Sequence, residues 1–98
     1  MMLKVTATED GYHLEGELDM ATAGDLGELL RERSARQTVL DFSGITFMDS
    51  SGLRVLLEAA GRHDGDGATV VILHPAAQVQ RVLEISIPGG TPGLEVRE

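Results

Sequence analysis

Apolar residues alternate with polar ones at the start of the chain, and the spacing then becomes helical. The alternation covers "LKVTA" (3–7) and "YHLEGEL" (12–18), and it predicts two strands that each bury one face. Asp10 and Gly11 lie between them and are typical of a tight turn. The chain is therefore predicted to begin with a β-hairpin.

Two later segments have apolar residues at helical spacing. The first is "DMATAGDLGELLRERSAR" (19–36), where Asp19 is predicted to cap the helix by accepting a hydrogen bond from the amide of Thr22. The second is "SSGLRVLLEAAGRHDG" (50–65), whose apolar residues recur at i, i+3, i+4 and i+7. Three glycines between positions 61 and 67 are expected to end this helix and form a turn.

The remaining segments predict further strands and a third helix. "TVLDFSGI" (38–45) indicates a strand, and "ATVVIL" (68–73) is typical of a strand buried on both faces. Pro75 suits the first turn of the third helix. "IPGGTPG" (87–93) is expected to be irregular, and "LEVRE" (94–98) indicates a short last strand.

This order of elements predicts an α/β fold. A hairpin followed by strand–helix alternation gives a small mixed β-sheet with a parallel part. The length of 98 residues fits one domain over positions 1–98. Apolar residues make up 42% of the chain and aromatic residues only 3%, so the core is expected to consist of Leu, Val, Ile and Ala.

The composition excludes several classes of function. The chain has no cysteine, which rules out disulfides, thiolate metal sites and a cysteine nucleophile. No apolar run approaches the roughly 20 residues of a membrane helix, and we expect a soluble, cytoplasmic protein with no membrane partner. A formal net charge of −8 repels phosphates, so direct binding of nucleic acid is not expected.

Catalytic and metal-binding motifs are also weak. The nucleophile pattern G-x-S-x-G is absent around Ser50 and Ser51, and among the histidines only His74 is expected near Ser50, beside a strand end. No His or carboxylate pair has a recognised metal-ligand spacing, and no phosphate-binding G-x-x-x-x-G-K-[ST] loop is present. We therefore expect a non-enzymatic protein without a cofactor or metal, with a small serine hydrolase as a remote alternative.

The junction "MDSSGL" (48–53) joins an apolar strand to the second predicted helix. Ser and Asp are favoured helix caps, so Asp49, Ser50 and Ser51 could serve only to begin the helix. A helix N-terminus also tolerates a negative group, so a serine here could carry a phosphate. Gly52 is expected to leave backbone open to a partner. The residues alone do not separate a cap from a modification site.

Three segments together resemble a known family. These are "GELD" (16–19), "FMDSSGL" (47–53) and "HPAAQVQRVLEIS" (74–86), which occur in this order. They are similar to the anti-sigma factor antagonists of the STAS domain family, over about residues 3–85. Glycine and an apolar residue commonly follow the last segment in that family, whereas here "IPGGTPG" (87–93) follows, so the family's final helix is expected to be missing or replaced by a loop.

The resemblance implies a phosphorylation switch. In this family the unphosphorylated antagonist binds an anti-sigma factor that is also a serine kinase and thereby frees a sigma factor. Phosphorylation of the first serine in the D-S-[ST]-G motif, here Ser50, abolishes binding, and a metal-dependent Ser/Thr phosphatase reverses it. The implied partner-binding residues are Asp19, Thr22, Met48, Asp49, Ser50, Ser51 and Gly52. An alternative is a STAS module in another regulatory or transporter-associated complex.

Overall fold

The computed structural model describes residues 3–33, 35–65 and 69–97. Strand–helix alternation follows an N-terminal pair of strands, as the sequence predicts. The elements are β1 (Leu3–Ala7), β2 (Gly11–Leu18), α1 (Ala23–Glu32), β3 (Gln37–Met48), α2 (Ser50–Gly65), β4 (Thr69–Leu73), α3 (Ala77–Ser86) and β5 (Leu94–Arg97).

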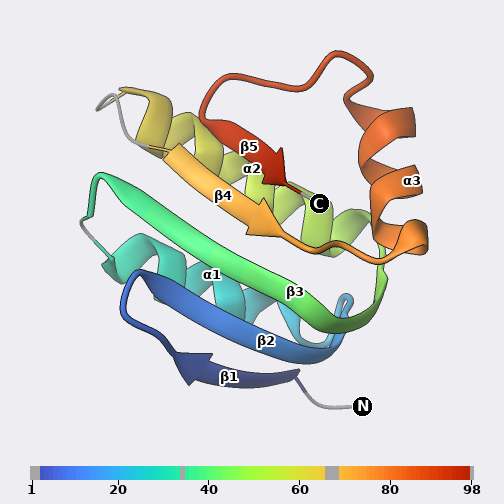
Figure 1. Ribbon diagram of the computed structural model, residues 1–98, viewed down its shortest axis with the longest axis horizontal. Coiled ribbons are helices and arrows are strands. Elements are labelled where there is room, and N and C mark those ends of the chain that lie inside the picture. The colour runs from blue at the N-terminus through green and yellow to red at the C-terminus, as the bar shows by residue number, and fades with distance from the viewer. Residues whose placement is uncertain (1–2, 34, 66–68, 98) are drawn as a thin grey trace.

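All five strands form one mixed sheet in the order β1-β2-β3-β4-β5. The β1–β2 hairpin is antiparallel, and the other three pairs are parallel. Parallel strands place their carboxyl ends at one edge of a sheet, where ligands and partners bind in open α/β folds. The segments that follow β2, β3 and β4 therefore begin at the same end of the molecule (Figure 1).

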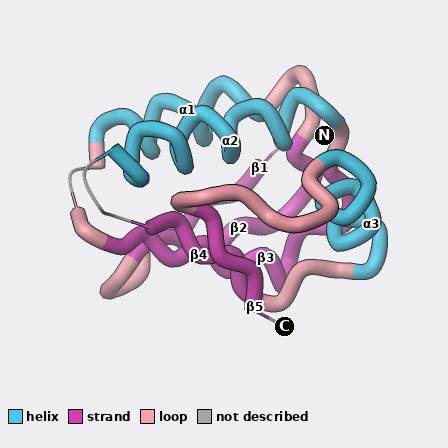
Figure 2. Tube along the Cα trace, turned by 90° about the horizontal axis from the view of Figure 1, so that it is seen from above, coloured by secondary structure: helices cyan, strands magenta, loops and turns pink. Residues whose placement is uncertain are grey.

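The helices α1 and α2 cover one face of the sheet and lie side by side (Figure 2). Helix α3 lies at the end of the sheet where β3 finishes, and it contacts α2 there (Figures 1 and 2). Aliphatic side chains dominate the core beneath α1 and α2, with Phe42 as its largest member. Val70, Val71 and Ile72 of β4 are all fully buried, which confirms the prediction of a strand covered on both faces.

Two predicted boundaries differ from the structure. Helix α1 begins at Ala23 and not at Asp19, because residues 20–22 form a turn held by the Asp19 side chain. Pro75 precedes α3, whose N-cap is Ala76 in extended backbone conformation. Helix α2 has the predicted bounds, and Gly61 lies inside it, since a glycine on an exposed helix surface lowers helix stability without breaking the helix.

Strand β3 continues well past the end of β4. Only Gln37 to Asp41 pair with β4, while the second half of β3 pairs with β2 as far as Met48. On the β4 side of this second half, α3 takes the place of a strand (Figure 1). The carboxyl end of β3 is therefore held between a strand and a helix.

No helix in the described parts of the chain is long and apolar enough to cross a lipid bilayer.

Candidate functional site

The "GELD" and "DSSG" segments meet at the carboxyl edge of the sheet. Leu18 pairs with Met48 as the last residues of β2 and β3, and the amide of Asp49 donates to the carbonyl oxygen of Leu18 at 3.2 Å. This contact fixes the start of the β3–α2 junction against the end of β2. Asp19 and Asp49, the residues directly after the two strands, line one shallow hollow.

Asp49 caps helix α2. Its Oδ1 accepts from the amide of Ser51 at 2.8 Å and from that of Gly52 at 3.4 Å, and its carbonyl oxygen accepts from Leu53 at 3.1 Å. These bonds satisfy amides that have no partner within the helix, as a favoured N-cap does. Of the three candidates for the cap, the structure therefore assigns the role to Asp49.

Ser50 is the first residue of α2 and is exposed. No hydrogen bond joins its hydroxyl to another group in the described parts of the chain, and the same is true of the half-buried Ser51. Asp49, and not the Ser50 hydroxyl, accepts the amides of Ser51 and Gly52 at the start of the helix. It stands at the positive end of a helix dipole, where added negative charge is tolerated.

Asp19 holds the β2–α1 turn. Its Oδ1 accepts from the amides of Ala21 at 3.0 Å and Thr22 at 3.2 Å, so the predicted bond to Thr22 is present. The Thr22 hydroxyl donates to the carbonyl oxygen of Glu17 at 2.7 Å and is buried. Thr22 therefore stabilises the turn from within and offers little surface to a partner.

Gly52 is buried against β2. A Cβ at this position would lie 2.7 Å from Leu18 Cγ and 2.9 Å from the Leu18 carbonyl oxygen. The space that the missing side chain leaves is occupied by Leu18. This corrects the expectation that Gly52 opens backbone to a partner, because it lets the first turn of α2 approach the sheet closely.

The side chain of Met48 is fully buried, so it too cannot present a contact to a partner. Its backbone is held from α3: the Met48 amide donates to Gln78 Oε1 at 2.9 Å, and Gln78 Nε2 donates to the Met48 carbonyl oxygen at 3.0 Å. A side-chain amide thus pairs with the N–H and C=O of the last residue of β3 as a neighbouring strand would.

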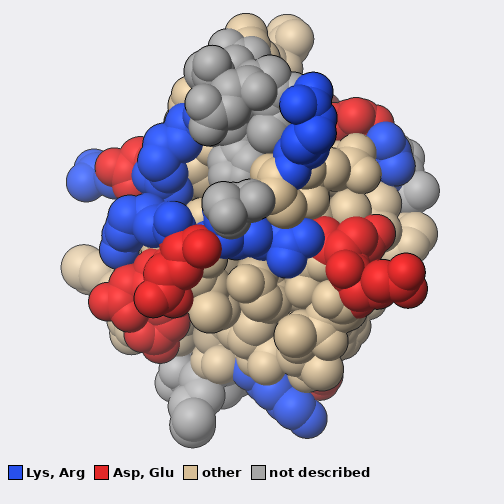
Figure 3. Space-filling model, turned by 90° about the vertical axis from the view of Figure 1, so that its left-hand side faces the viewer, with Lys and Arg blue, Asp and Glu red and all other residues tan. Residues whose placement is uncertain are grey.

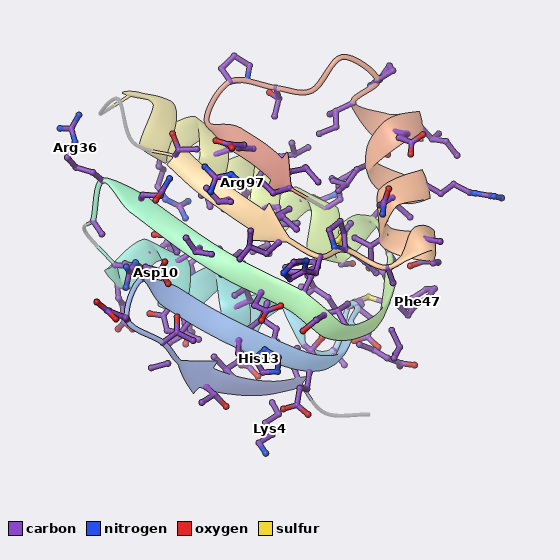
Figure 4. All side chains as sticks on the ribbon, in the orientation of Figure 1. Lys4, Asp10, His13, Arg36, Phe47 and Arg97 are labelled. Carbon is purple, nitrogen blue, oxygen red and sulfur yellow. The ribbon has the colours of Figure 1, made fainter. Side chains whose placement is uncertain are left out.

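Two exposed apolar residues complete the site and were not predicted from the sequence. Met20 is 82% exposed and Phe47 is 39% exposed, although large apolar side chains favour burial. With Asp19, Ala21 and Asp49 they line the hollow of about 480 Å³ (Phe47 is labelled in Figure 4). An apolar side chain in the turn directly after "GELD" was the available signal for Met20.

The site at this edge of the sheet is acidic. Neither Asp19 nor Asp49 forms an ion pair with a basic side chain in the described residues. Figure 3 shows the opposite end of the molecule, where Lys and Arg side chains lie among Asp and Glu side chains, and Arg36 lies at that end in Figure 4. The edge that carries Ser50 therefore has unpaired carboxylates beside apolar side chains.

A polar cluster occupies the sheet face away from α1 and α2. His13 Nδ1 lies 3.2 Å from Asp41 Oδ2, and His13 Nε2 lies 3.5 Å from Glu15 Oε1 (Figure 4 labels His13). Partial burial opposes ionisation of Asp41, but hydrogen bonds from Ser43 and the nearby His13 outweigh it and lower the pKa of Asp41 below its usual value. This cluster lies between β2 and β3 and is separate from Ser50.

The geometry does not assemble a serine–histidine pair from the described side chains. His13 contacts carboxylates in the middle of β2, and no hydrogen bond links His74 to Ser50 or Ser51. The side chain of His63 lies outside the described residues. Among the described residues no three His, Asp or Glu side chains are grouped closely enough to hold a metal ion.

Comparison with protein families gives a match over residues 2–87, to the family described as "Mlab, STAS domain". The chain belongs to the STAS domain family. This STAS match includes both β-strand ends and the whole of α2 and α3, so it covers the site described above.

Three solved structures resemble this STAS domain. One is a Thermotoga maritima protein assigned as an anti-sigma factor antagonist, with a TM-score of 0.79, 17% identity, and coverage of 98% of this chain and 86% of that one. The second is the anti-sigma factor antagonist SpoIIAA in its unphosphorylated form, with a TM-score of 0.64 and 17% identity. The match covers 94% of this chain and 86% of that one. The third is Bacillus SpoIIAA in its phosphorylated form, with a TM-score of 0.68 and 19% identity. The match covers 96% of this chain and 89% of that one. The fold is therefore that of the anti-sigma factor antagonists.

Proposed function

We propose that this protein is an anti-sigma factor antagonist that is switched by phosphorylation of Ser50. The unphosphorylated form binds an anti-sigma factor that is also a serine kinase, and this binding frees a sigma factor. The kinase transfers a phosphate to the Ser50 hydroxyl, after which the complex dissociates. A metal-dependent Ser/Thr phosphatase restores the binding form. In this scheme the STAS domain is a substrate and a binding module, and not an enzyme.

The observation that carries this proposal is the division of roles between Asp49 and Ser50. Asp49 Oδ1 accepts the helix amides, whereas the Ser50 hydroxyl is exposed and bonded to no described group. A kinase can therefore reach the hydroxyl without unfolding the helix end. Solved structures of SpoIIAA in an unphosphorylated and a phosphorylated form support the proposal, because a protein of this fold can carry a phosphate.

The electrostatics favour a switch that acts on binding and not on folding. A phosphate adds a charge of about −1.5 to −2 next to Asp49, on a surface that also carries Asp19. The positive end of the α2 dipole offsets part of this charge within the domain. In an interface, the phosphate must also lose its water, and a loss of about 3 kcal/mol weakens binding roughly a hundredfold.

The partner surface on this proposal consists of the exposed and half-exposed residues around the hollow. They are Asp19, Met20, Ala21, Phe47, Asp49, Ser50 and Ser51. The buried Thr22, Met48 and Gly52 support this surface from beneath. Their expected role in partner binding is thus indirect.

The test is to incubate the protein with a candidate anti-sigma factor kinase and Mg-ATP and to map the product by mass spectrometry. We expect one phosphate, located on Ser50. Ser50→Ala should accept none, whereas the control Ser86→Ala, at an exposed serine that ends α3 outside the partner surface, should be modified at a rate close to that of the wild type. Equal phosphorylation of Ser50→Ala and the wild type would overturn the assignment of the site.

A second candidate is a STAS module in another regulatory or transporter-associated complex. The description of the matching family as "Mlab, STAS domain", with no mention of sigma factors, favours keeping it. This alternative predicts that the kinase adds no phosphate to Ser50. It also predicts that the unphosphorylated protein does not bind an anti-sigma factor. A fluorophosphonate probe separates both candidates from a serine hydrolase, since only the hydrolase would be labelled stoichiometrically.

A further inference from the structure

We propose that Gln78 is a positioning residue for the Ser50 site and acts on it through the backbone of Met48. The inference concerns the phosphorylation of Ser50 and so rests on the proposed function. Its structural part is independent of any kinase. The carrying feature is the pair of hydrogen bonds between the Gln78 side chain and Met48, at 2.9 and 3.0 Å.

These bonds replace a missing strand. β4 ends at Leu73, opposite Asp41, so the last seven residues of β3 have no strand on the α3 side. In a parallel sheet, successive residues direct their amide and carbonyl groups to opposite sides. The Asp49 amide bonds to Leu18 on the β2 side, and the amide and carbonyl of Met48 turn to Gln78 on the other.

The junction before Ser50 is therefore clamped from two directions. Leu18 of β2 holds the Asp49 amide, and Gln78 near the start of α3 holds the amide and the carbonyl of the preceding residue, Met48. Asp49 in turn accepts the amides of Ser51 and Gly52 through its side chain. Releasing Met48 from Gln78 leaves the position of Asp49, and hence of Ser50, set from the β2 side alone.

Gln80 provides a matched control on the same helix. Its Nε2 donates to the carbonyl oxygen of Pro75 at 3.0 Å, and like Gln78 it is half-buried. Gln80→Leu therefore removes a glutamine hydrogen bond within α3 and its approach, without touching β3. A difference between Gln78→Leu and Gln80→Leu reports the contact with Met48 and not the general effect of a leucine on α3.

The first readout is amide hydrogen exchange of residues 49–53 in the intact protein. We expect Gln78→Leu to speed their exchange by about tenfold, as the loss of hydrogen bonds at a helix start allows local opening. Residues 56–60, in the middle of α2, should exchange as in the wild type. Gln80→Leu should leave both groups unchanged. Equal exchange of residues 49–53 in the two variants would overturn the proposal.

Gln78→Glu separates positioning from packing by its pH dependence. An ionised carboxylate accepts from the Met48 amide but repels the Met48 carbonyl, whereas a protonated one both accepts and donates like glutamine. The ratio of the Gln78→Glu exchange rate to the wild-type rate, taken for residues 49–53 at each pH, should be above one at pH 7. It should fall toward one near pH 4, where the new carboxyl group becomes protonated. Gln78→Leu should stay raised at both. A ratio for Gln78→Glu that does not change with pH would contradict the role.

The functional readout is the rate at which the anti-sigma factor kinase phosphorylates Ser50. Gln78→Leu should reduce kcat/KM by about tenfold relative to Gln80→Leu, since misplacing the acceptor weakens its alignment. If exchange changes as expected and phosphorylation does not, Gln78 does not position Ser50 and the inference fails. If wild-type Ser50 accepts no phosphate, the proposed function fails, while the exchange result still decides whether Gln78 holds the junction.

Discussion

Gly52 of α2 packs directly on Leu18 of β2, with no room for a side chain between them. A Cβ on Gly52 would lie 2.7 Å from Leu18 Cγ and 2.9 Å from Leu18 Cδ2. Leu18 belongs to the "GELD" segment at the end of β2, and Gly52 belongs to the "FMDSSGL" segment that leads from β3 into α2. Their contact explains why a glycine follows the serines, because only a residue without a side chain lets the first turn of α2 pack this closely against β2.

Substitution of Gly52 is therefore expected to destabilise the fold. Gly52→Ala should lower the free energy of unfolding by about 1–3 kcal/mol, because the added methyl group overpacks a buried contact that includes backbone. Gly61→Ala is the matched control in the same helix, where a Cβ would meet nothing within 4 Å. It should raise stability by roughly 0.5–1 kcal/mol through helix propensity. Urea unfolding that ranks the two variants in the other order would contradict this packing.

The cap of α2 is predicted to depend on Asp49 alone. Asp49→Ala should cost about 0.5–2 kcal/mol of unfolding free energy, since the Ser51 and Gly52 amides lose their acceptor. Asp49→Asn should retain most of the stability, because its amide oxygen can accept the same bonds. Thermal unfolding of Ser50→Ala and Ser51→Ala provides the comparison. A loss in either serine variant as large as in Asp49→Ala would move the cap to a serine.

A charge at position 50 should weaken binding while the fold persists. Ser50→Asp is expected to keep its melting temperature within a few degrees, because the residue is exposed at a helix N-terminus. Calorimetric titration with the anti-sigma factor should show a weaker Kd than for the wild type. Ser51→Asp, one residue further on, tests whether position 50 is special. A collapse of the fold in Ser50→Asp would indicate a structural role for the Ser50 hydroxyl.

The exposed apolar residues at the site should matter for binding and not for stability. Met20→Ala, at a residue 82% exposed, should change the unfolding free energy by less than about 0.5 kcal/mol. If the hollow contacts the partner, the same change should weaken binding by about 1 kcal/mol or more. Ile85→Ala is the control, since Ile85 is 74% exposed on α3 and does not line this hollow. Equal loss of affinity in both variants would argue against the hollow as the contact.

The His13–Asp41 cluster predicts a loss of stability in acid. The pKa of Asp41 is lower in the folded protein than in the unfolded chain, so the native state binds fewer protons. Its contribution is fully present above the unfolded pKa of about 3.9 and is lost as the pH falls through the lower folded value. Asp41→Asn should therefore reduce the difference in urea midpoint between pH 6 and pH 3. If the urea midpoints of Asp41→Asn at pH 6 and pH 3 differ as much as those of the wild type, other carboxylates cause the loss of stability in acid.

The sequence by itself predicted the element order and the candidate site residues. Alternation and helical spacing are local properties, so the hairpin, the buried β4 and the amphipathic α2 could be predicted from neighbouring residues. The family resemblance implied that both Asp19 and Asp49 bind a partner, and the structure then showed that they lie at the same edge of the sheet. Sequence alone could not choose between cap and modification site at "DSSG", because both need a small polar residue at a helix start.

Only the tertiary structure divided the roles among those residues. Asp49 became the cap, Ser50 was left exposed, and Gly52 proved to be a packing residue, because each outcome depends on how closely α2 approaches β2. Contacts between elements also decide the exposure of Met20 and Phe47. The hydrogen bonds of Gln78 to Met48 join residues that are 30 positions apart in the sequence. Such long-range contacts leave no periodic signal along the chain, since they form only when distant segments pack.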